Sequence, residues 1–282
     1  MPAFVYVFVL TIFPSAYTLY YSFTGLNLAR PQYGAPFVGL LNYVQLVSDP
    51  LFQQSLLNTG LLSLLDISAE LVIGYLFASL LARDIKGISI FRTAALVPLM
   101  IPSVVVAFTW LYIARPFGLL HYIVTRIGLP APDFFGNPSA ALYTLIGINI
   151  WQWTPFVIIV LAAGMQGVPT AALEAADLDG ASWWQKQRHI SFPMLTGIIA
   201  IVTLFRFVDD FRVFDTIYVT TGGGPGSATY TIAFYGYQQS FKYFNIGYGS
   251  ALSWMINVLV LIVATILFRA ILRAARGQGG SK

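Results

Sequence analysis

Six long apolar segments are the feature that most restricts how this chain can fold. A membrane-spanning helix needs about 20 mostly apolar residues at a rise of 1.5 Å each. That length selects the segments 3–23, 57–82, 88–114, 139–163, 194–218 and 248–270. Their apolar runs are continuous and do not alternate over about ten residues, which disfavours spanning strands. The sequence therefore predicts an all-α integral membrane protein with six transmembrane helices.

The composition agrees and excludes several classes of function. Hydrophobic residues make up 57% of the 282 residues and charged residues only 9%, whereas soluble domains carry about 25% charged residues. The net charge is +4, but the basic residues lie singly at the ends of apolar runs. Because no basic face with interleaved aromatic residues forms, nucleic acid is not expected as a partner. With no cysteine and only His121 and His189, far apart in the chain, no metal site is expected.

The basic residues also predict orientation, because Lys and Arg collect in cytoplasmic loops. If the N-terminus is inside, nine basic residues fall on the inner side, namely Arg83, Lys86, Arg92, Lys186, Arg188, Arg269, Arg273, Arg276 and Lys282. Four fall outside, namely Arg30, Arg115, Arg126 and Lys242, while Arg206 and Arg212 lie inside the fifth segment. We therefore expect both termini and the loop 164–193 to face the cytoplasm.

The chain is expected to form a single transmembrane domain over residues 1–282, with a core at about 53–272. It opens directly into apolar sequence, without the basic leader or small-residue cleavage pattern of a signal peptide. The first segment is therefore predicted to be a retained span.

The loop 164–193 interrupts the apolar sequence with a short polar run. Pro169 and Thr170 indicate a helix start, with the Thr hydroxyl accepting from an unpaired amide. Gly180 suits a left-handed C-cap, and Ser182 could cap a second short helix running toward Pro193. We expect a helix, a tight turn and a second helix, with Glu174 and Asp177 offered as surface charges.

The spacing within this loop is specific. Glu174-Ala175-Ala176 is followed by Gly180 and, after nine intervening residues, by Ile190-Ser191-Phe192-Pro193. This pattern resembles the signature of the permease subunits of type I ABC importers, which have the MetI-like fold, and departs from it in having Phe192 where Leu is usual. The resemblance implies a coupling helix that contacts an ATPase subunit through Glu174, Ala175, Ala176, Asp177, Gly180, Ile190 and Pro193. The alternative is a solvated amphipathic loop between helices.

A second resemblance covers the fifth segment and the loop after it. Phe205-Arg206, residues 211–218 and Gly222-Gly223-Gly224-Pro225 are similar to the carbohydrate-uptake branch of these importers. It implies a second, homologous permease, two ATPase subunits that bind ATP and Mg²⁺, and an extracytoplasmic solute-binding protein. It also implies the inner membrane of a bacterium or archaeon, a carbohydrate or polyol as substrate, and no cofactor on this chain.

The fifth segment contains charges that lipid would not tolerate. Counted from Met194, Arg206 falls near the middle of the membrane, where an unpaired charge costs several kcal/mol. Asp209 and Asp210 follow three and four residues later, and Arg212 and Asp215 come next, so each charge is expected to have an opposite neighbour on an adjacent helical face. These groups either bind solute hydroxyls or form a structural ion-pair network. Asp66 and Glu70 in the second segment raise the same question.

Other polar and aromatic residues inside the spans are candidates for the solute path, because sugars offer hydroxyls to amides and C–H faces to aromatic rings. They are Asn149, Gln152 and Trp153 in the fourth span and Ser253, Trp254 and Asn257 in the last. Asn149 and Asn257 are expected to be buried amides that need partners. Pro98, Pro102 and Pro155 are expected to bend their spans.

No catalytic motif is present. The chain lacks the phosphate-binding pattern G-x-x-x-x-G-K-[ST] and the metalloprotease pattern H-E-x-x-H. The main rival to an importer subunit is a proton- or ion-coupled transporter that uses the charges of the fifth segment. An enzyme with Asp209 and Asp210 as an acid pair is disfavoured, because adjacent side chains on a helix diverge by about 100°.

Overall fold

The computed structural model describes residues 2–81 and 88–279, and all of its regular elements are helices. The long ones are α4 (Pro50–Leu81), α8 (Pro138–Met165), α11 (Phe192–Asp210) and α14 (Ile246–Gly279). The shorter ones, in chain order, are α1 (Pro2–Val7), η1 (Phe8–Ile12), α2 (Phe13–Ser22), η2 (Pro31–Tyr33), α3 (Leu41–Ser48), α5 (Ile88–Met100), α6 (Ser103–Ala114), α7 (Leu119–Arg126), α9 (Thr170–Leu178), α10 (Trp183–Lys186), η3 (Gln187–Ser191), α12 (Asp215–Thr220), α13 (Ile232–Tyr237) and η4 (Gln238–Lys242). Arg83, Lys86 and Lys282, which entered the orientation argument, lie outside the described residues.

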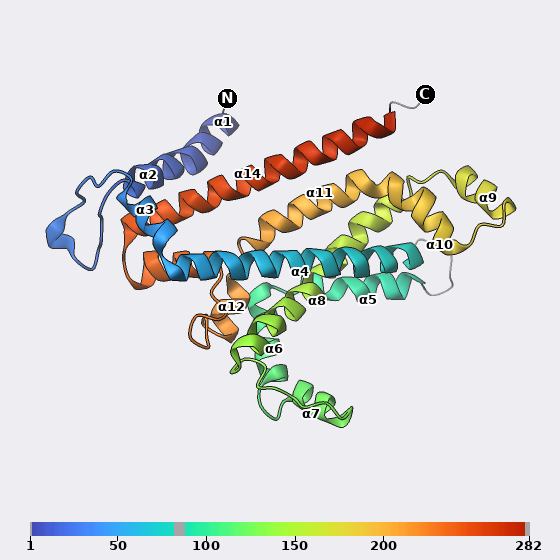
Figure 1. Ribbon diagram of the computed structural model, residues 1–282, viewed down its shortest axis with the longest axis horizontal. Coiled ribbons are helices and arrows are strands. Elements are labelled where there is room, and N and C mark those ends of the chain that lie inside the picture. Colours follow the sequence, from blue (N-terminus) through green and yellow to red (C-terminus); the bar gives the residue numbers. More distant parts are fainter. Residues whose placement is uncertain (1, 82–87, 280–282) are drawn as a thin grey trace.

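The expected all-α membrane fold is confirmed. Five helical stretches are long and apolar enough to span a membrane, and a sixth span is a bent pair. In that pair, residues 93–100 of α5 and all of α6 meet at 99°. Pro102 has no N–H to continue the helix and is the N-cap of α6, so the bend expected in this segment lies at residues 101–102. The predicted third span is therefore two helices (Figure 1).

The fifth span differs from its predicted bounds of 194–218. It begins at Trp183 and ends at Asp210, so the second short helix expected in the loop is the first turn of the span itself. The chain then turns and starts α12 with Asp215, whose negative charge is favoured at a helix N-terminus. Arg206 consequently lies one turn before the end of α11 and not at the centre of a long span.

The core of the bundle is formed where α4, α8 and α11 pack together. Ala78, Val157, Leu161 and Val202 are buried in one cluster that joins these three helices. Gly74 allows α4 to approach α8 closely, since a Cβ on it would lie 2.6 Å from Val157 Cγ1. Small residues at such contacts are typical of helix packing in membranes, where van der Waals contact holds helices together.

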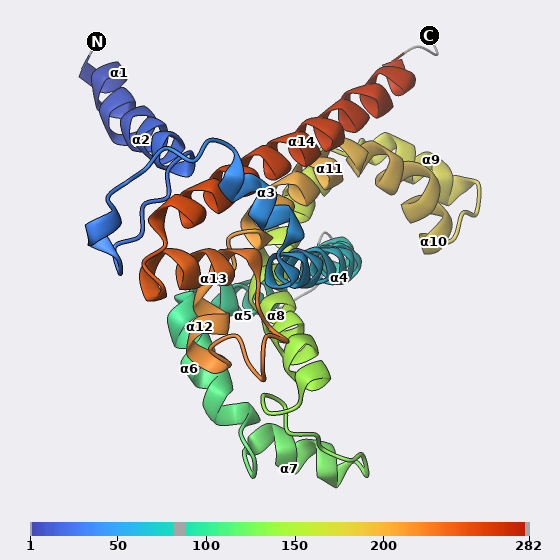
Figure 2. The same ribbon diagram turned by 60° about the vertical axis from the view of Figure 1, so that its left-hand side comes forward.

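The periphery is arranged around this core. Helix α2 lies beside the start of α14, whereas α1 and the remainder of α14 extend away from each other (Figure 2). Helices α9 and α10 form a hairpin that projects from one end of α8 and α11 (Figure 2). The fold thus holds one set of candidate residues in its interior and another at its tip.

Candidate functional site

The first candidate region is the hairpin of α9 and α10, residues 170–186, which we call the 170–186 hairpin. Its turn follows local rules. Gly180 has φ +73°, a left-handed conformation that glycine adopts without strain. Ser182 and Gln185 form a capping box, in which Gln185 Oε1 accepts from the Ser182 amide at 2.7 Å. The expected turn and second cap are therefore confirmed.

One expected cap is absent. Helix α9 begins at Thr170 with Pro169 as its N-cap residue, and no side chain caps it. The Thr170 hydroxyl was expected to accept from a free amide, but Thr170 is itself the first helical residue, so its hydroxyl does not have the position of a cap. The predicted start of α9 is therefore correct, and its predicted side-chain cap is wrong.

The predicted contact residues of the hairpin differ in exposure. Glu174 and Ala175 are exposed and Ala176 is half-buried. Asp177 Oδ1 forms an ion pair with Lys186 Nζ at 2.5 Å, which connects α9 to α10. Ile190 lies in the π-helical segment η3 and Pro193 in the first turn of α11. Glu174 and Asp179 are therefore exposed acids without an ion pair among the described residues, while Asp177 also holds the hairpin together.

The second candidate region lies inside the bundle around Arg206. The Arg206 side chain is 2% exposed, and it contacts Glu70 of α4 through Nε at 2.6 Å and Nη2 at 2.9 Å. Nη2 also donates to Asp210 Oδ1 at 2.7 Å, and Nη1 donates to Asp209 Oδ2 at 2.9 Å. The guanidinium lies 4.8 Å from the centroid of the Trp153 ring, a cation–π distance. The expected pairing of Arg206 with Asp209 and Asp210 is therefore confirmed.

Helix α8 completes this arrangement through Asn149. Its amide nitrogen donates to Asp66 of α4 and, at 3.3 Å, to Asp210 of α11. Asp66, Glu70 and Asp210 are all fully buried. We call Asp66, Glu70, Asn149, Arg206, Asp209 and Asp210 the Arg206 cluster. It links three helices, which confirms that Asn149 is a buried amide with partners.

The cluster contains more hydrogen-bond acceptors than donors. Arg206 is the buried cation within the described residues, and it faces three buried carboxylates. Asp66 Oδ1 and Asp210 Oδ2 are buried and have no hydrogen-bond partner in the described part of the chain. The guanidinium already makes four of the five hydrogen bonds its N–H groups allow. Most donors of the cluster are therefore engaged in ion pairs within it, and at most one guanidinium N–H is left for a ligand.

A small polar cavity, which we call the Asp209 cavity, lies beside the cluster at Asp209. Its volume is about 150 Å³, and it is lined by Ser103, Asn149, Gln152, Trp153, Asp209 and Arg212, with the turn 213–216 closing it. The Asp209 side chain is 38% exposed. The structure thus brings five of the predicted solute-path residues to one cavity: Asn149, Gln152, Trp153, Asp209 and Arg212.

Gln152 also stabilises the broken third span. Its amide nitrogen donates to the Ile101 carbonyl and to Ser103 Oγ, each at 3.2 Å. The Ile101 carbonyl lies at the bend between α5 and α6, where the helical hydrogen-bond ladder is interrupted. The Gln152 side chain of α8 therefore donates a hydrogen bond to a backbone carbonyl that has lost its helical partner at the proline.

Two expectations about charged and polar residues were wrong. Arg212 is exposed and, within the described residues, makes no ion pair with Asp215, because the helix ends at Asp210 and the two residues no longer lie on one helical face. Asn257 is exposed on α14 and has no hydrogen-bond partner in the described chain. It was expected to be a buried amide.

The other two α14 candidates are not part of the Asp209 cavity. Ser253 lines a separate cavity of about 310 Å³, mostly apolar, between α13 and α14. Its hydroxyl donates to the Gly249 carbonyl of its own helix at 2.9 Å. Trp254 is half-buried. The predicted solute-path residues therefore do not all line one cavity.

Sequence reasoning missed the partnership of Glu70 with Arg206 and the position of Tyr75. Glu70 and Arg206 are 136 residues apart, and the only signal was that a buried arginine and buried acids occurred in different spans. Tyr75 Oη donates to Gln187 Oε1 in η3 at 2.9 Å. No sequence pattern marked Tyr75, because an aromatic residue in an apolar span is common.

Comparisons with known proteins identify the family of this chain. Residues 70–276 match the family model of the binding-protein-dependent transport system inner membrane component. The trehalose/maltose transport system permease protein MalF of Thermococcus litoralis is 36% identical over 80% of this chain and 77% of its own length. The trehalose transport system permease protein SugA of Mycobacterium tuberculosis is 34% identical over 98% of this chain and 88% of its own.

A solved structure shares the fold. In the bacterial ABC transporter that imports the acidic polysaccharide alginate, one chain aligns with a TM-score of 0.83 at 22% identity, covering 97% of this chain and 93% of that one. The family match spans most of the chain, and it confirms a multi-pass membrane transport subunit over the ion-coupled transporter and the intramembrane enzyme. The protein belongs to the family of inner membrane components of binding-protein-dependent transport systems.

Proposed function

We propose that this protein is the permease subunit of an ATP-driven importer of a carbohydrate or polyol. The observation that carries this proposal is the 170–186 hairpin, which projects from a transport-family membrane bundle and exposes Glu174 next to small residues. A second, homologous permease, two ATPase subunits and an extracytoplasmic solute-binding protein complete the importer. ATP and Mg²⁺ are bound by the ATPase subunits.

The hairpin is the contact with an ATPase subunit in this proposal. Glu174 supplies an exposed charge, and Ala175, Ala176 and Gly180 let another backbone approach closely. Both termini and the hairpin face the cytoplasm. Motion of the ATPase subunits displaces the hairpin, and the bundle changes between inward-open and outward-open states.

The Asp209 cavity is the solute contact of this chain. A carboxylate accepts hydrogen bonds from hydroxyls, Arg212 donates them, and the Trp153 ring offers an apolar face to C–H groups. The names of the relatives that share a third of the sequence support a sugar as solute. Since the cavity of about 150 Å³ holds only a few non-hydrogen atoms, this chain contacts one part of the solute and the second permease contacts the rest.

The exposed α14 residues support the second permease. Asn257 points away from the rest of this chain, and an amide facing lipid has no hydrogen-bond partner. A second permease packed on this side of α14 covers Asn257 and places it and Trp254 at the solute path between the two chains. Asn257→Leu is then expected to weaken uptake without loss of assembly, measured as the initial rate of solute uptake by vesicles.

Cross-linking tests the ATPase contact directly. The chain contains no cysteine, so a single cysteine in Ala176→Cys or Gly180→Cys is the only thiol of this subunit. In the membrane complex expressed with its ATPase subunits, each variant should cross-link to an ATPase subunit. Absence of that product from both variants contradicts the proposal.

A charge reversal adds a functional readout with a control in the same hairpin. Glu174→Lys is expected to abolish ATPase binding and uptake, while membrane insertion is unchanged. Asp179→Lys reverses an equally exposed charge at the C-cap of α9 and should have a much smaller effect. If Glu174→Lys transports normally, the coupling role of the hairpin is wrong.

A further inference from the structure

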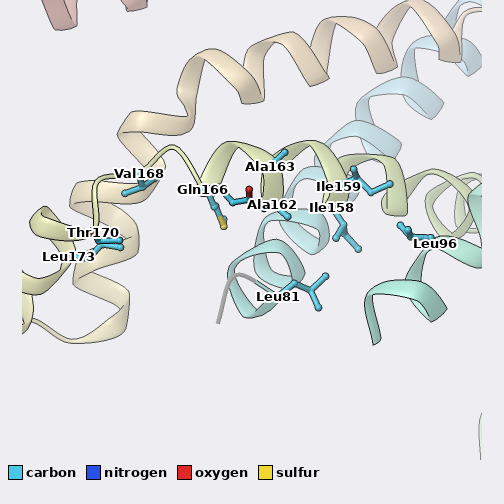
Figure 3. Close-up of a pocket in the computed structure, with 11 residues that line it drawn as sticks. Leu81, Leu96, Ile158, Ile159, Ala162, Ala163, Gln166, Val168, Thr170 and Leu173 are labelled. Atoms are coloured by element: carbon cyan, nitrogen blue, oxygen red, sulfur yellow. The ribbon is translucent and has the colours of Figure 1, made fainter. Parts of the chain in front are cut away.

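An apolar cavity separates the 170–186 hairpin from the helices beneath it. Its volume is about 630 Å³. Figure 3 shows Thr170 and Leu173 of α9 on one side of it, and Ile158 of α8 and Leu96 of α5 on the other. Because α9 does not pack tightly on α5 and α8, a displacement of α9 is poorly transmitted through this space. The base of the hairpin, residues 187–192, contacts the core directly instead.

At that base, one side chain of α4 holds the chain at two points. Tyr75 Oη donates to Gln187 Oε1 at 2.9 Å. The Tyr75 ring also meets the Phe192 ring edge to face, with centroids 5.7 Å apart and an interplanar angle of 67°. Tyr75 packs against the buried cluster of Ala78, Val157, Leu161 and Val202. The tyrosine therefore fastens residues 187–192 to the core of the bundle.

The fastened segment is a π-helix. In η3, Gln187–Ser191, the ladder is widened, and the Phe192 amide donates to the Gln187 carbonyl five residues earlier. Such segments are rare and are found preferentially at functional positions of helices. They are also places where a long helix bends or changes register. A hairpin joined to its span through such a segment needs an outside contact to keep its direction.

We propose that Tyr75 is a positioning residue that couples movement of the 170–186 hairpin to the bundle. It holds the π-helical base of the hairpin against α4, so that α4 and α11 move together when the hairpin is displaced. The same two helices are joined again by Glu70 and Arg206. Two separate attachments prevent α11 from rotating on α4, and a hairpin displacement then reaches the Arg206 cluster. This inference rests on the proposed function.

The test is the number of solute molecules transported per ATP hydrolysed in the complete complex, reconstituted in proteoliposomes with its binding protein. Tyr75→Phe removes the hydroxyl and keeps the ring on Phe192. Because one hydrogen bond shifts an equilibrium by roughly two- to tenfold, we expect the transport-to-ATP ratio to fall by about that factor. Gln187→Leu removes the acceptor and should have the same effect.

Two further variants separate coupling from general damage. Gln187→Glu keeps an acceptor for the Tyr75 hydroxyl and should retain the wild-type ratio. Tyr43→Phe removes a comparable hydrogen bond, 2.7 Å to Ser22 Oγ, far from the hairpin and should leave the ratio unchanged. The proposal is overturned by a normal ratio in both Tyr75→Phe and Gln187→Leu, or by Gln187→Glu failing like Gln187→Leu. It is also overturned if these two variants only lower the amount of complex and leave its ratio unchanged.

Failure of the proposed function gives a different result. A wild-type complex that binds no ATPase subunit, or takes up solute without ATP, contradicts the importer assignment before any variant is compared. A wild-type complex with ATP-driven uptake and unaffected Tyr75→Phe and Gln187→Leu variants contradicts only the role of Tyr75.

Discussion

The 170–186 hairpin and the Arg206 cluster are both polar regions in an apolar chain, and they are built in opposite ways. The hairpin uses neighbours in sequence: Gly180 makes the turn, and Ser182 caps the next helix through Gln185. The cluster takes Glu70, Asn149 and Arg206 from three different helices. The hairpin is exposed, whereas most of the cluster is buried. A surface that another protein must reach is specified locally, and an interior charge is specified by the whole bundle.

This difference determines what a mutation does in each region. Removing one charge from a buried network leaves other charges without compensation in a medium of low dielectric. Removing a local contact from an exposed hairpin loosens a few residues, because water satisfies the groups that are left. The predictions that follow compare buried with exposed positions of the same residue type where the chain offers both.

The largest effect is expected for Arg206→Leu. The substitution leaves Glu70 and Asp210 buried without a cation among the described residues, which costs on the order of 3–5 kcal/mol. Thermal unfolding of the purified protein in detergent should therefore show a strongly lowered midpoint, or the protein should fail to accumulate. The matched change Arg212→Leu removes an exposed arginine six residues further on and should cost about 0.5 kcal/mol or less. Equal effects for the two arginines would show that the cluster does not hold the helices together.

The next effect concerns the contact between α4, which carries Glu70, and α8, which carries Asn149. In Gly74→Ala, the new Cβ lies 2.6 Å from Val157 Cγ1, so α4 must move away from α8 at a cost of about 1–3 kcal/mol. Gly60→Ala in the same helix meets no atom within 4 Å and should be neutral or slightly stabilising. The same unfolding measurement compares them. A neutral Gly74→Ala would mean that the close approach of α4 and α8 is not needed.

The contrast also explains how much the sequence predicts. The spans follow from length and hydropathy, and the hairpin turn follows from Gly180 and Ser182, because both depend on residues close in sequence. The pair Glu70 and Arg206 does not follow, since it depends on how α4 packs against α11. The sequence predicts that Glu70 and Arg206 lie inside the membrane and need partners of opposite charge. It does not predict that they pair with each other.

The errors have the same origin. Asn257 was expected to be buried because an amide in an apolar helix needs a partner, and α14 exposes it on the surface of the single chain. The fifth span was predicted to continue to residue 218, because most residues at 211–218 are apolar although Arg212 and Asp215 interrupt them. The structure ends α11 at Asp210, whose carboxylate pairs with Arg206 of the same helix and accepts from Asn149 of α8. The end of α11 and the exposure of Asn257 both depend on contacts between helices or between chains. Hydropathy along one sequence does not contain that information.

A smaller and more local effect is expected for Ser182→Ala. The change removes the capping box at the start of α10 and should destabilise that turn by about 1 kcal/mol. Hydrogen exchange of the amides at 183–186 should accelerate about fivefold, while amides of α4 and α8 keep their wild-type protection. Ser48→Ala, which removes a hydroxyl from the exposed end of α3, serves as the control. Acceleration that extends into α8 would show that the hairpin and the bundle unfold together.

The smallest expected effect tests a residue that combines both kinds of contact. Asp49 Oδ1 accepts locally from the Leu51 amide at 2.8 Å, and its other oxygen accepts from the hydroxyls of Tyr235 and, at 2.6 Å, Tyr248. Partial burial raises the pKa of Asp49, but these hydrogen bonds outweigh it and hold the pKa below its ordinary value. A carboxyl with a lowered folded-state pKa stabilises the fold at pH values above its unfolded pKa of about 3.9, and this contribution is lost as the pH falls through the folded value. We therefore expect the unfolding midpoint in detergent to drop slightly between about pH 4 and pH 3, and Asp49→Asn to remove that part of the drop. An unchanged pH profile in Asp49→Asn would mean that neither the tyrosine hydroxyls nor the Leu51 amide lowers the pKa of Asp49 enough to affect stability.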